Sequence, residues 1–171
     1  TPDMLIKLAK TTWWNERRDR YRYFVGVEGA IPQKRMKNHL FGLMVGYVKD
    51  LGVYAHCMFH KVQSTDGEWN DFTPHPWTTG NSTLSLNAAT VGVMYRCLGP
   101  IYLNLGLGYM SNKVSWETAS GKYLKYNSDC YDGMCGELGA FMRIKHLILS
   151  GGYICGDTPA TCSYVGLGYI F

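Results

Sequence analysis

The sequence predicts an all-β fold: an eight-stranded antiparallel up-and-down β-barrel that crosses a membrane. Three observations predict it. Apolar residues alternate with small or polar ones through eight segments, short and long connections alternate between these segments, and residues 163–171 end the chain on an apolar alternating run. Because successive side chains of a strand point to opposite faces, such alternation gives each strand one apolar face and one polar face.

The composition suits a membrane barrel and excludes membrane helices. The chain has 171 residues, enough for one domain, with 14% aromatic residues and 20 glycines. Its mean hydropathy is only −0.15, and no run approaches the ~18 consecutive apolar residues that a membrane helix needs. A barrel exposes only alternate residues to lipid, which keeps the mean hydropathy low. The net charge of +4 is too small to indicate a nucleic-acid partner.

Alternation and turn signals together place the strands. We expect strands at 22–31, 39–48, 53–63, 84–97, 101–116, 134–144, 147–155 and 163–171. The tight turns are 49–52, 98–100 and 145–146, and the long loops are 31–38, 64–83, 118–133 and 156–161. Outer-membrane barrels have short turns on the periplasmic rim and long loops outside. With eight strands, both termini are therefore expected on the periplasmic side.

The polarity of the two faces distinguishes a membrane barrel from a soluble one. A lipocalin-like barrel would point large apolar residues inward around a ligand. Here the charged residues share a face with glycines, which suits a narrow, crowded interior, and the apolar face is expected to contact lipid. Aromatic residues would form girdles at the membrane boundaries. The expected girdle residues are Tyr23, Tyr47, Tyr95, Tyr109, Tyr153, Tyr169 and Phe171.

The polar face supplies a candidate interior network. Its ionisable members are expected to be Glu28, His56, His60, Arg96, Glu137 and Arg143. Unpaired charges are costly in a poorly hydrated interior, so we interpret the set as a plug of ion pairs and hydrogen bonds. Counted from the rim with the short turns, the two glutamates are expected higher in the barrel than the two arginines. Either the arginine side chains reach up to the carboxylates, or one carboxylate shares a proton. A proton or ion path through His56 and His60 is the alternative interpretation.

The six cysteines lack the spacing of a zinc site, and neither a metal nor a cofactor is expected. Cys130 and Cys135 bracket one short polar stretch, and Cys155 and Cys162 bracket another. We expect two loop-tying disulfides, as in proteins of an oxidising compartment. Isolated thiols are the alternative.

Two long loops are candidate contact surfaces. The first, 31–38, is basic and suits the phosphates of lipopolysaccharide. A charged loop that only contacts solvent explains these residues equally well. The cations of 31–38 are Lys34, Arg35 and Lys37. The second, 64–83, combines acidic residues with aromatic ones, which indicates contact with a neighbouring protein. Its aromatic residues are Trp69, Phe72 and Trp77.

Residues 1–20 form a separate N-terminal segment ahead of the barrel, which occupies 21–171. Thr1 and Pro2 suit a helix start, and an apolar stripe follows them. We expect either a short amphipathic helix at the inner-leaflet boundary or a plain tether.

The last strand carries the pattern Tyr164-x-Gly166-x-x-Tyr169-x-Phe171. It resembles the C-terminal signature by which the barrel-assembly machinery recognises outer-membrane proteins. The layout of 21–171 is similar to the OmpA transmembrane domain and to OmpX and OmpW-like barrels. This resemblance implies a bacterial outer membrane, with lipid and lipopolysaccharide around the barrel. The six cysteines and the N-terminal segment depart from the simplest members and favour a Bacteroidetes-type source.

The resemblance specifies no activity, so several functions remain. The leading hypothesis is a non-enzymatic structural protein or an accessory subunit of a larger outer-membrane assembly, with other outer-membrane or periplasmic proteins as partners. A surface adhesin is the nearest alternative. A lipid A-modifying barrel enzyme would need a His with a Ser at the outer leaflet. The pairs available are His60 with Ser64 and His75 with Ser82.

Overall fold

The structure is a computed structural model and describes residues 22–32, 40–59, 65–69, 76–127, 130–156 and 161–171. Ten strands occupy these ranges, and none of the described residues forms a helix with the length and hydropathy needed to cross a membrane. Their bounds are β1 Tyr23–Pro32, β2 Leu40–Tyr47, β3 Leu51–Phe59, β4 Gly67–Trp69, β5 Thr78–Leu98, β6 Ile101–Thr118, β7 Tyr123–Tyr126, β8 Tyr131–Ile144, β9 Leu147–Cys155 and β10 Thr161–Ile170.

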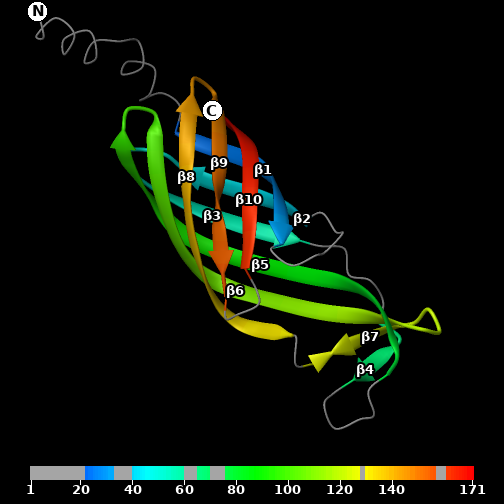
Figure 1. The fold of residues 1–171 in the computed structure, drawn as a ribbon. Coiled ribbons are helices and arrows are strands. Elements are labelled where there is room, and N and C mark those ends of the chain that lie inside the picture. Colours follow the sequence, from blue (N-terminus) through cyan, green and yellow to red (C-terminus); the bar gives the residue numbers. More distant parts are fainter. Residues whose placement is uncertain (1–21, 33–39, 60–64, 70–75, 128–129, 157–160) are drawn as a thin grey trace, which may run out of the picture.

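Eight of these strands close into an antiparallel barrel, which confirms the predicted fold. The ring runs β1-β2-β3-β5-β6-β8-β9-β10 and returns to β1, with the β6–β8 pairing joining its two halves (Figure 1). Closure pairs the backbone along every side of the ring and removes the open edges that hydrocarbon would penalise.

The predicted alternation of short turns is also confirmed. β2–β3, β5–β6 and β8–β9 are joined by tight turns at one rim, with Gly99 at φ 48° and Lys145 at φ 57°. The C-terminus lies at the same rim, where the Phe171 amide donates to the Tyr23 carbonyl over 2.8 Å. We call this end the short-turn rim.

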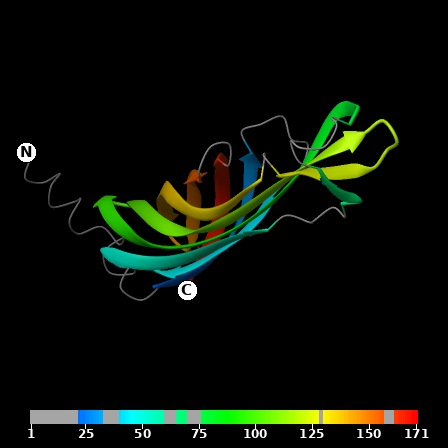
Figure 2. The same cartoon turned by 90° about the horizontal axis from the view of Figure 1, so that it is seen from below.

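The largest departure from the predicted strands is the hairpin of β5 and β6. β5 begins at Thr78 rather than at Leu84, and it pairs with β6 well beyond the last residue that pairs with β3, Ala88. β7 adds to β6, and β4 pairs in parallel with β7. This unit, which we call the extension, projects beyond the barrel at the end away from the C-terminus (Figures 1 and 2). The expected loops 64–83 and 118–133 therefore contain ordered strands.

The side chains face as the alternation predicted. The outer surface of the ring carries a belt of exposed apolar residues. Examples from six strands are Val27, Leu43, Val91, Leu105, Leu138 and Leu167. The girdle aromatics Tyr23, Tyr95, Tyr109, Tyr153, Tyr169 and Phe171 are exposed as well, and Tyr47 is half-buried.

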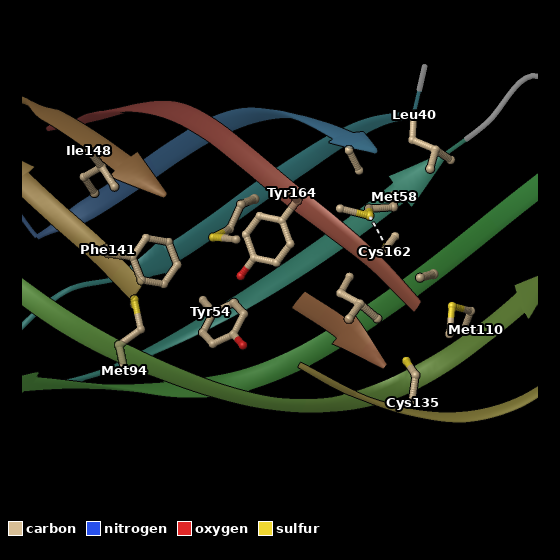
Figure 3. Packing of buried hydrophobic residues seen from close by; sticks show 14 of the residues in the cluster. Leu40, Tyr54, Met58, Met94, Met110, Cys135, Phe141, Ile148, Cys162 and Tyr164 are labelled. Atoms are coloured by element: carbon tan, nitrogen blue, oxygen red, sulfur yellow. Dashed lines mark hydrogen bonds between the residues drawn. The ribbon is translucent and has the colours of Figure 1, made fainter. Parts of the chain in front are cut away.

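The interior is filled by side chains of a narrow barrel, as expected for eight strands. Near the short-turn rim it is aromatic: Phe141 lies edge-on to both Phe24 and Tyr54, with ring centroids 5.9 Å apart in each pair. Towards the other end Met58, Met110 and Cys162 fill it (Figure 3). Between these apolar layers lies the charged cluster described next.

Candidate functional site: a buried charge cluster and a projecting sheet

Three strands place a histidine between two carboxylates inside the barrel. His56 comes from β3, Glu28 from β1 and Glu137 from β8, and their side chains are at most 1% exposed. His56 Nε2 lies 2.7 Å from Glu28 Oε2, and His56 Nδ1 lies 3.2 Å from Glu137 Oε1. Only the Nδ1 contact has hydrogen-bond geometry, and the Nε2 contact is an ion-pair distance. The histidine therefore lies between two acids, and its doubly protonated form is the cation that both carboxylates would face.

Neutral groups complete the coordination of Glu137. Tyr164 donates its hydroxyl to Glu137 Oε1 over 2.6 Å, the Asn104 amide donates to the same oxygen over 3.2 Å, and Thr90 donates to Oε2. Asn104 also donates to the Tyr54 hydroxyl over 3.1 Å. A carboxylate with this many donors keeps its charge out of water at a far smaller cost than a bare one.

Glu28 accepts a hydrogen bond from β9, and β10 leaves space for its side chain. Ser150 donates to Glu28 Oε1 over 2.6 Å. Gly166 of β10 makes the room: a Cβ at this position would stand 2.4 Å from Glu28 Cγ and 2.5 Å from Ser150 Oγ. The glycines on the polar face therefore give the charged side chains space to lie across the barrel.

The carboxylates are not paired in either of the ways expected from the sequence, by the arginines or by a proton on one acid. Neither arginine needs to reach the carboxylates, because His56 lies between them. Arg143 is buried, with Nε 3.4 Å from the Lys145 carbonyl at the short-turn rim. Arg96 was expected in the lumen network, but it lies at the rim, half-exposed, with Nη1 3.2 Å from Asp50 Oδ1. His60 lies outside the described residues, so the proton path stays a prediction.

Sequence reasoning missed the neutral members of the cluster. Tyr54, Thr90, Asn104 and Ser150 all have inward parity in their strands, and parity is the signal that selects them. Which of the many inward polar residues meet at one level depends on the stagger between strands, and alternation does not specify that stagger.

The disulfide expectation was wrong. All six cysteines are free thiols in the structure. Cys155 and Cys162 lie on opposite faces, since Cys155 is exposed and Cys162 fully buried. Cys130 precedes β8 and Cys135 lies within it, and five residues of extended chain span roughly 16 Å, whereas bridged Cα atoms lie within about 7 Å.

The terminal motif also divides between the two faces. Tyr164 and Gly166 serve the interior cluster, while Tyr169 and Phe171 are 52% and 56% exposed on the outer surface. Two of the four motif residues thus have a packing reason in the folded barrel, and the other two are exposed on its outer surface.

The extension has its own small core and its own ion pair. Trp69 of β4 is 7% exposed and stacks on Tyr126 of β7 with centroids 4.4 Å apart. Lys125 Nζ donates to Glu68 Oε1 over 2.9 Å. This hydrogen bond lowers the pKa of the Glu68 carboxyl and raises the pKa of the Lys125 ammonium. The Asp66 carboxylate accepts from the Tyr123 amide over 3.1 Å.

The expected contact residues are therefore not equivalent. Trp69 is an internal anchor of the extension rather than an exposed contact, because it is covered by Tyr126. Trp77 is 88% exposed. The remaining contact candidates lie outside the described residues: Lys34, Arg35, Lys37 and Phe72. The N-terminal segment 1–20 and the candidate catalytic residues Ser64 and His75 lie outside them as well. Within the described ranges, no group of three or more His, Cys, Asp or Glu is arranged to hold a metal ion.

Comparison with known proteins bears on the fold. No protein-family model matches the sequence, and no curated protein matches it. The crystal structure of Ail, the attachment invasion locus protein of Yersinia pestis, is similar with a TM-score of 0.59 and 13% identity, over 88% of this chain and 97% of Ail. The chain has the fold of a small outer-membrane β-barrel.

Two further Ail structures agree with this assignment. Ail in complex with the heparin analogue sucrose octasulfate aligns with a TM-score of 0.57 and 13% identity, over 88% of this chain and 97% of Ail. The backbone structure of Ail in a phospholipid bilayer nanodisc aligns with a TM-score of 0.55 and 15% identity, over 88% and 99%. At these identities the likeness concerns the fold alone.

Proposed function

We propose that the protein is an integral barrel of the bacterial outer membrane that acts, without enzymatic activity, as a structural protein or as an accessory subunit of a larger outer-membrane assembly. Both termini then face the periplasm, and the extension stands outside the membrane. Lipid and lipopolysaccharide surround the barrel, and other outer-membrane or periplasmic proteins are its partners.

The exposed apolar belt supports the membrane location. Its residues would be a severe liability in water, because soluble monomers rarely expose apolar patches above a few hundred Å². The belt ends near Tyr109 on β6, and the next outward residues on that strand are Ser111 and Lys113. This change supports a membrane boundary at the level where the extension begins.

The extension is the observation that carries the accessory role. It is an ordered sheet with a stacked aromatic pair, an ion pair and backbone hydrogen bonds between β4, β7 and β6. Ordering these residues costs conformational entropy, and a loop that only joins two strands would not need to be ordered in this way. Trp77 is exposed at the far end of this sheet, where its carbonyl accepts from the Ala119 amide. Its position supports protein recognition, since exposed tryptophan is typical of contact hot spots. The densely filled interior supports a barrel that holds the extension in place rather than a conducting pore.

The test is purification from native membranes in mild detergent, with a photo-crosslinking amino acid at position 77. We expect a partner in fixed stoichiometry that crosslinks at 77. The control carries the crosslinker at 49 in the β2–β3 turn, at the opposite rim. A protein that purifies alone, and whose crosslinks at 77 match those at 49, would contradict the accessory role.

An adhesin is the second candidate, favoured by the projection of the extension away from the C-terminus (Figure 2). The same preparation distinguishes it: binding of the isolated protein to a surface or glycan, without any stoichiometric partner, would replace the accessory role. A change in lipid A mass that depends on the protein would instead indicate a lipid A-modifying enzyme.

A further inference from the structure

The short-turn rim carries a ring of cations. Arg22 precedes β1, Lys49 lies in the β2–β3 turn, Arg96 is near the end of β5, and Lys145 lies in the β8–β9 turn. Each of the three tight turns therefore has a Lys or Arg in it or beside it, and a fourth cation stands where the chain enters the barrel. The positive charge is spread round the circumference instead of converging on one pocket.

Negative charge is scarce at this rim and common at the other end. Among the described residues of the short-turn rim, Asp50 is the only acid, and it already pairs with Arg96. The described part of the opposite end carries acids and lysines in similar numbers. They are Asp66, Glu68, Glu117 and Asp132, with Lys113, Lys122 and Lys125.

Aromatic side chains fix the height of the cations relative to the apolar belt. Arg22 Nη1 donates to the Tyr47 hydroxyl over 3.2 Å, and the Tyr47 ring lies edge-on to Tyr23 with centroids 5.3 Å apart. At the β8–β9 turn the His146 ring stacks on Tyr169 at 5.6 Å. Tyrosines of this kind occupy the membrane–water interface, so the basic groups beside them lie at the level of lipid headgroups.

We propose that the short-turn rim binds the phosphate groups of anionic phospholipids in the adjoining leaflet. This rests on the proposed membrane location and adds the chemistry of the lipid that the rim selects. A ring of separate cations fits many headgroups of a leaflet and not one soluble anion, because no single phosphate can contact groups on different strands of the ring. Each cation near a charged surface adds to the attraction, and salt weakens it.

The test measures how strongly spin-labelled phosphatidylglycerol, relative to spin-labelled phosphatidylcholine, associates with the barrel in mixed bilayers. Wild type is expected to prefer phosphatidylglycerol by at least about twofold at low salt. The rim variant combines Arg22→Gln, Lys49→Gln and Lys145→Gln. The matched control removes the same charge at the other end with Lys113→Gln, Lys122→Gln and Lys125→Gln. The preference should fall towards one in the rim variant and persist in the control.

Each other outcome overturns the proposal. Equal association of the two lipids with wild type rejects it whether or not the variants fold, and so does an equal loss in both variants. Inorganic phosphate that abolishes the preference, where chloride of the same ionic strength does not, would assign the rim to free phosphate. Failure of the barrel to insert into bilayers at all would instead reject the proposed membrane location.

Discussion

The barrel interior and the extension both pair acids with bases, and they do so under opposite conditions. The side chains of Glu28, His56 and Glu137 are at most 1% exposed, whereas those of Lys125 and Glu68 are 22% and 63% exposed. In the interior a lost partner leaves a charge without water, so each member depends strongly on the others. In the extension water replaces a lost partner, and the pair contributes little. Ion pairs of similar length can therefore contribute very differently to the stability of the protein.

Removing the histidine should break the interior most severely. In His56→Leu two carboxylates face each other without a cation, and we expect a loss of about 3–5 kcal/mol in the free energy of unfolding. Urea titration in lipid bilayers, followed by the heat-dependent gel mobility of the barrel, measures it. Adding Glu28→Gln to His56→Leu removes one of the two acids and should recover part of the loss. Unfolding curves that coincide for wild type and His56→Leu would show that the cluster does not stabilise the barrel.

The next largest effect is expected from Gly166→Ala. The new methyl group would meet Glu28 Cγ, Ser150 Oγ and the Val27 carbonyl at 2.4–2.9 Å, and overpacking of this kind costs about 1–3 kcal/mol. Gly136 is the matched control: it lies on the outer side of β8, and a Cβ there has no neighbour within 4 Å. Gly136→Ala should leave the urea midpoint unchanged or raise it. An equal loss in both variants would mean that strand backbone, not interior space, sets the requirement for glycine.

The extension should open without affecting the barrel. Trp69→Ala removes the stacking on Tyr126, which is worth about 0.5–1.5 kcal/mol beyond the buried area. We expect faster protease cleavage near β4 and β7, with the urea midpoint of the barrel unchanged. Trp77→Ala, at a highly exposed site, should leave cleavage unchanged. If Trp69→Ala lowered the stability of the barrel itself, the two regions would be a single cooperative unit.

The smallest effect concerns the ion pair of the extension. The hydrogen bond from Lys125 lowers the pKa of Glu68 and raises that of Lys125. The contribution of the pair is therefore complete near neutral pH. It is lost in acid as pH falls through the lowered pKa of Glu68, and in alkali as pH rises through the raised pKa of Lys125. Amide hydrogen exchange in β7 should show this pH dependence, and Glu68→Gln should flatten its acid limb while leaving exchange in the barrel unchanged.

The sequence was sufficient for the ring because each barrel strand separates an apolar outer face from an interior face. Alternation therefore marks both the strand and its orientation, and the predicted bounds of 101–116 and 147–155 lie close to those of β6 and β9. The inward position of Glu28, His56, Glu137 and Arg143 follows from the same parity.

The extension lacked this signal. Residues 78–83, Thr-Thr-Gly-Asn-Ser-Thr, have water on both sides, so no face needs to be apolar and the stretch reads as a loop. β4 and β7 have three and four residues, and their parallel pairing joins segments that are far apart in the chain. The two cysteine pairs fail for different reasons. Cys130 and Cys135 are separated along an extended stretch of chain, whereas Cys155 and Cys162 come from paired strands but lie on opposite faces of the sheet.

The seam between β1 and β10 has a consequence for biogenesis. These strands come from opposite ends of the ring sequence, and their ladder joins Phe24 to Ile170. Until β10 pairs with β1, the incomplete sheet has two edge strands with unpaired backbone groups and an exposed apolar outer face. Both features promote aggregation in water. Completion of the ring is therefore a late, long-range event, because β1 and β10 can pair only once the whole barrel sequence is available.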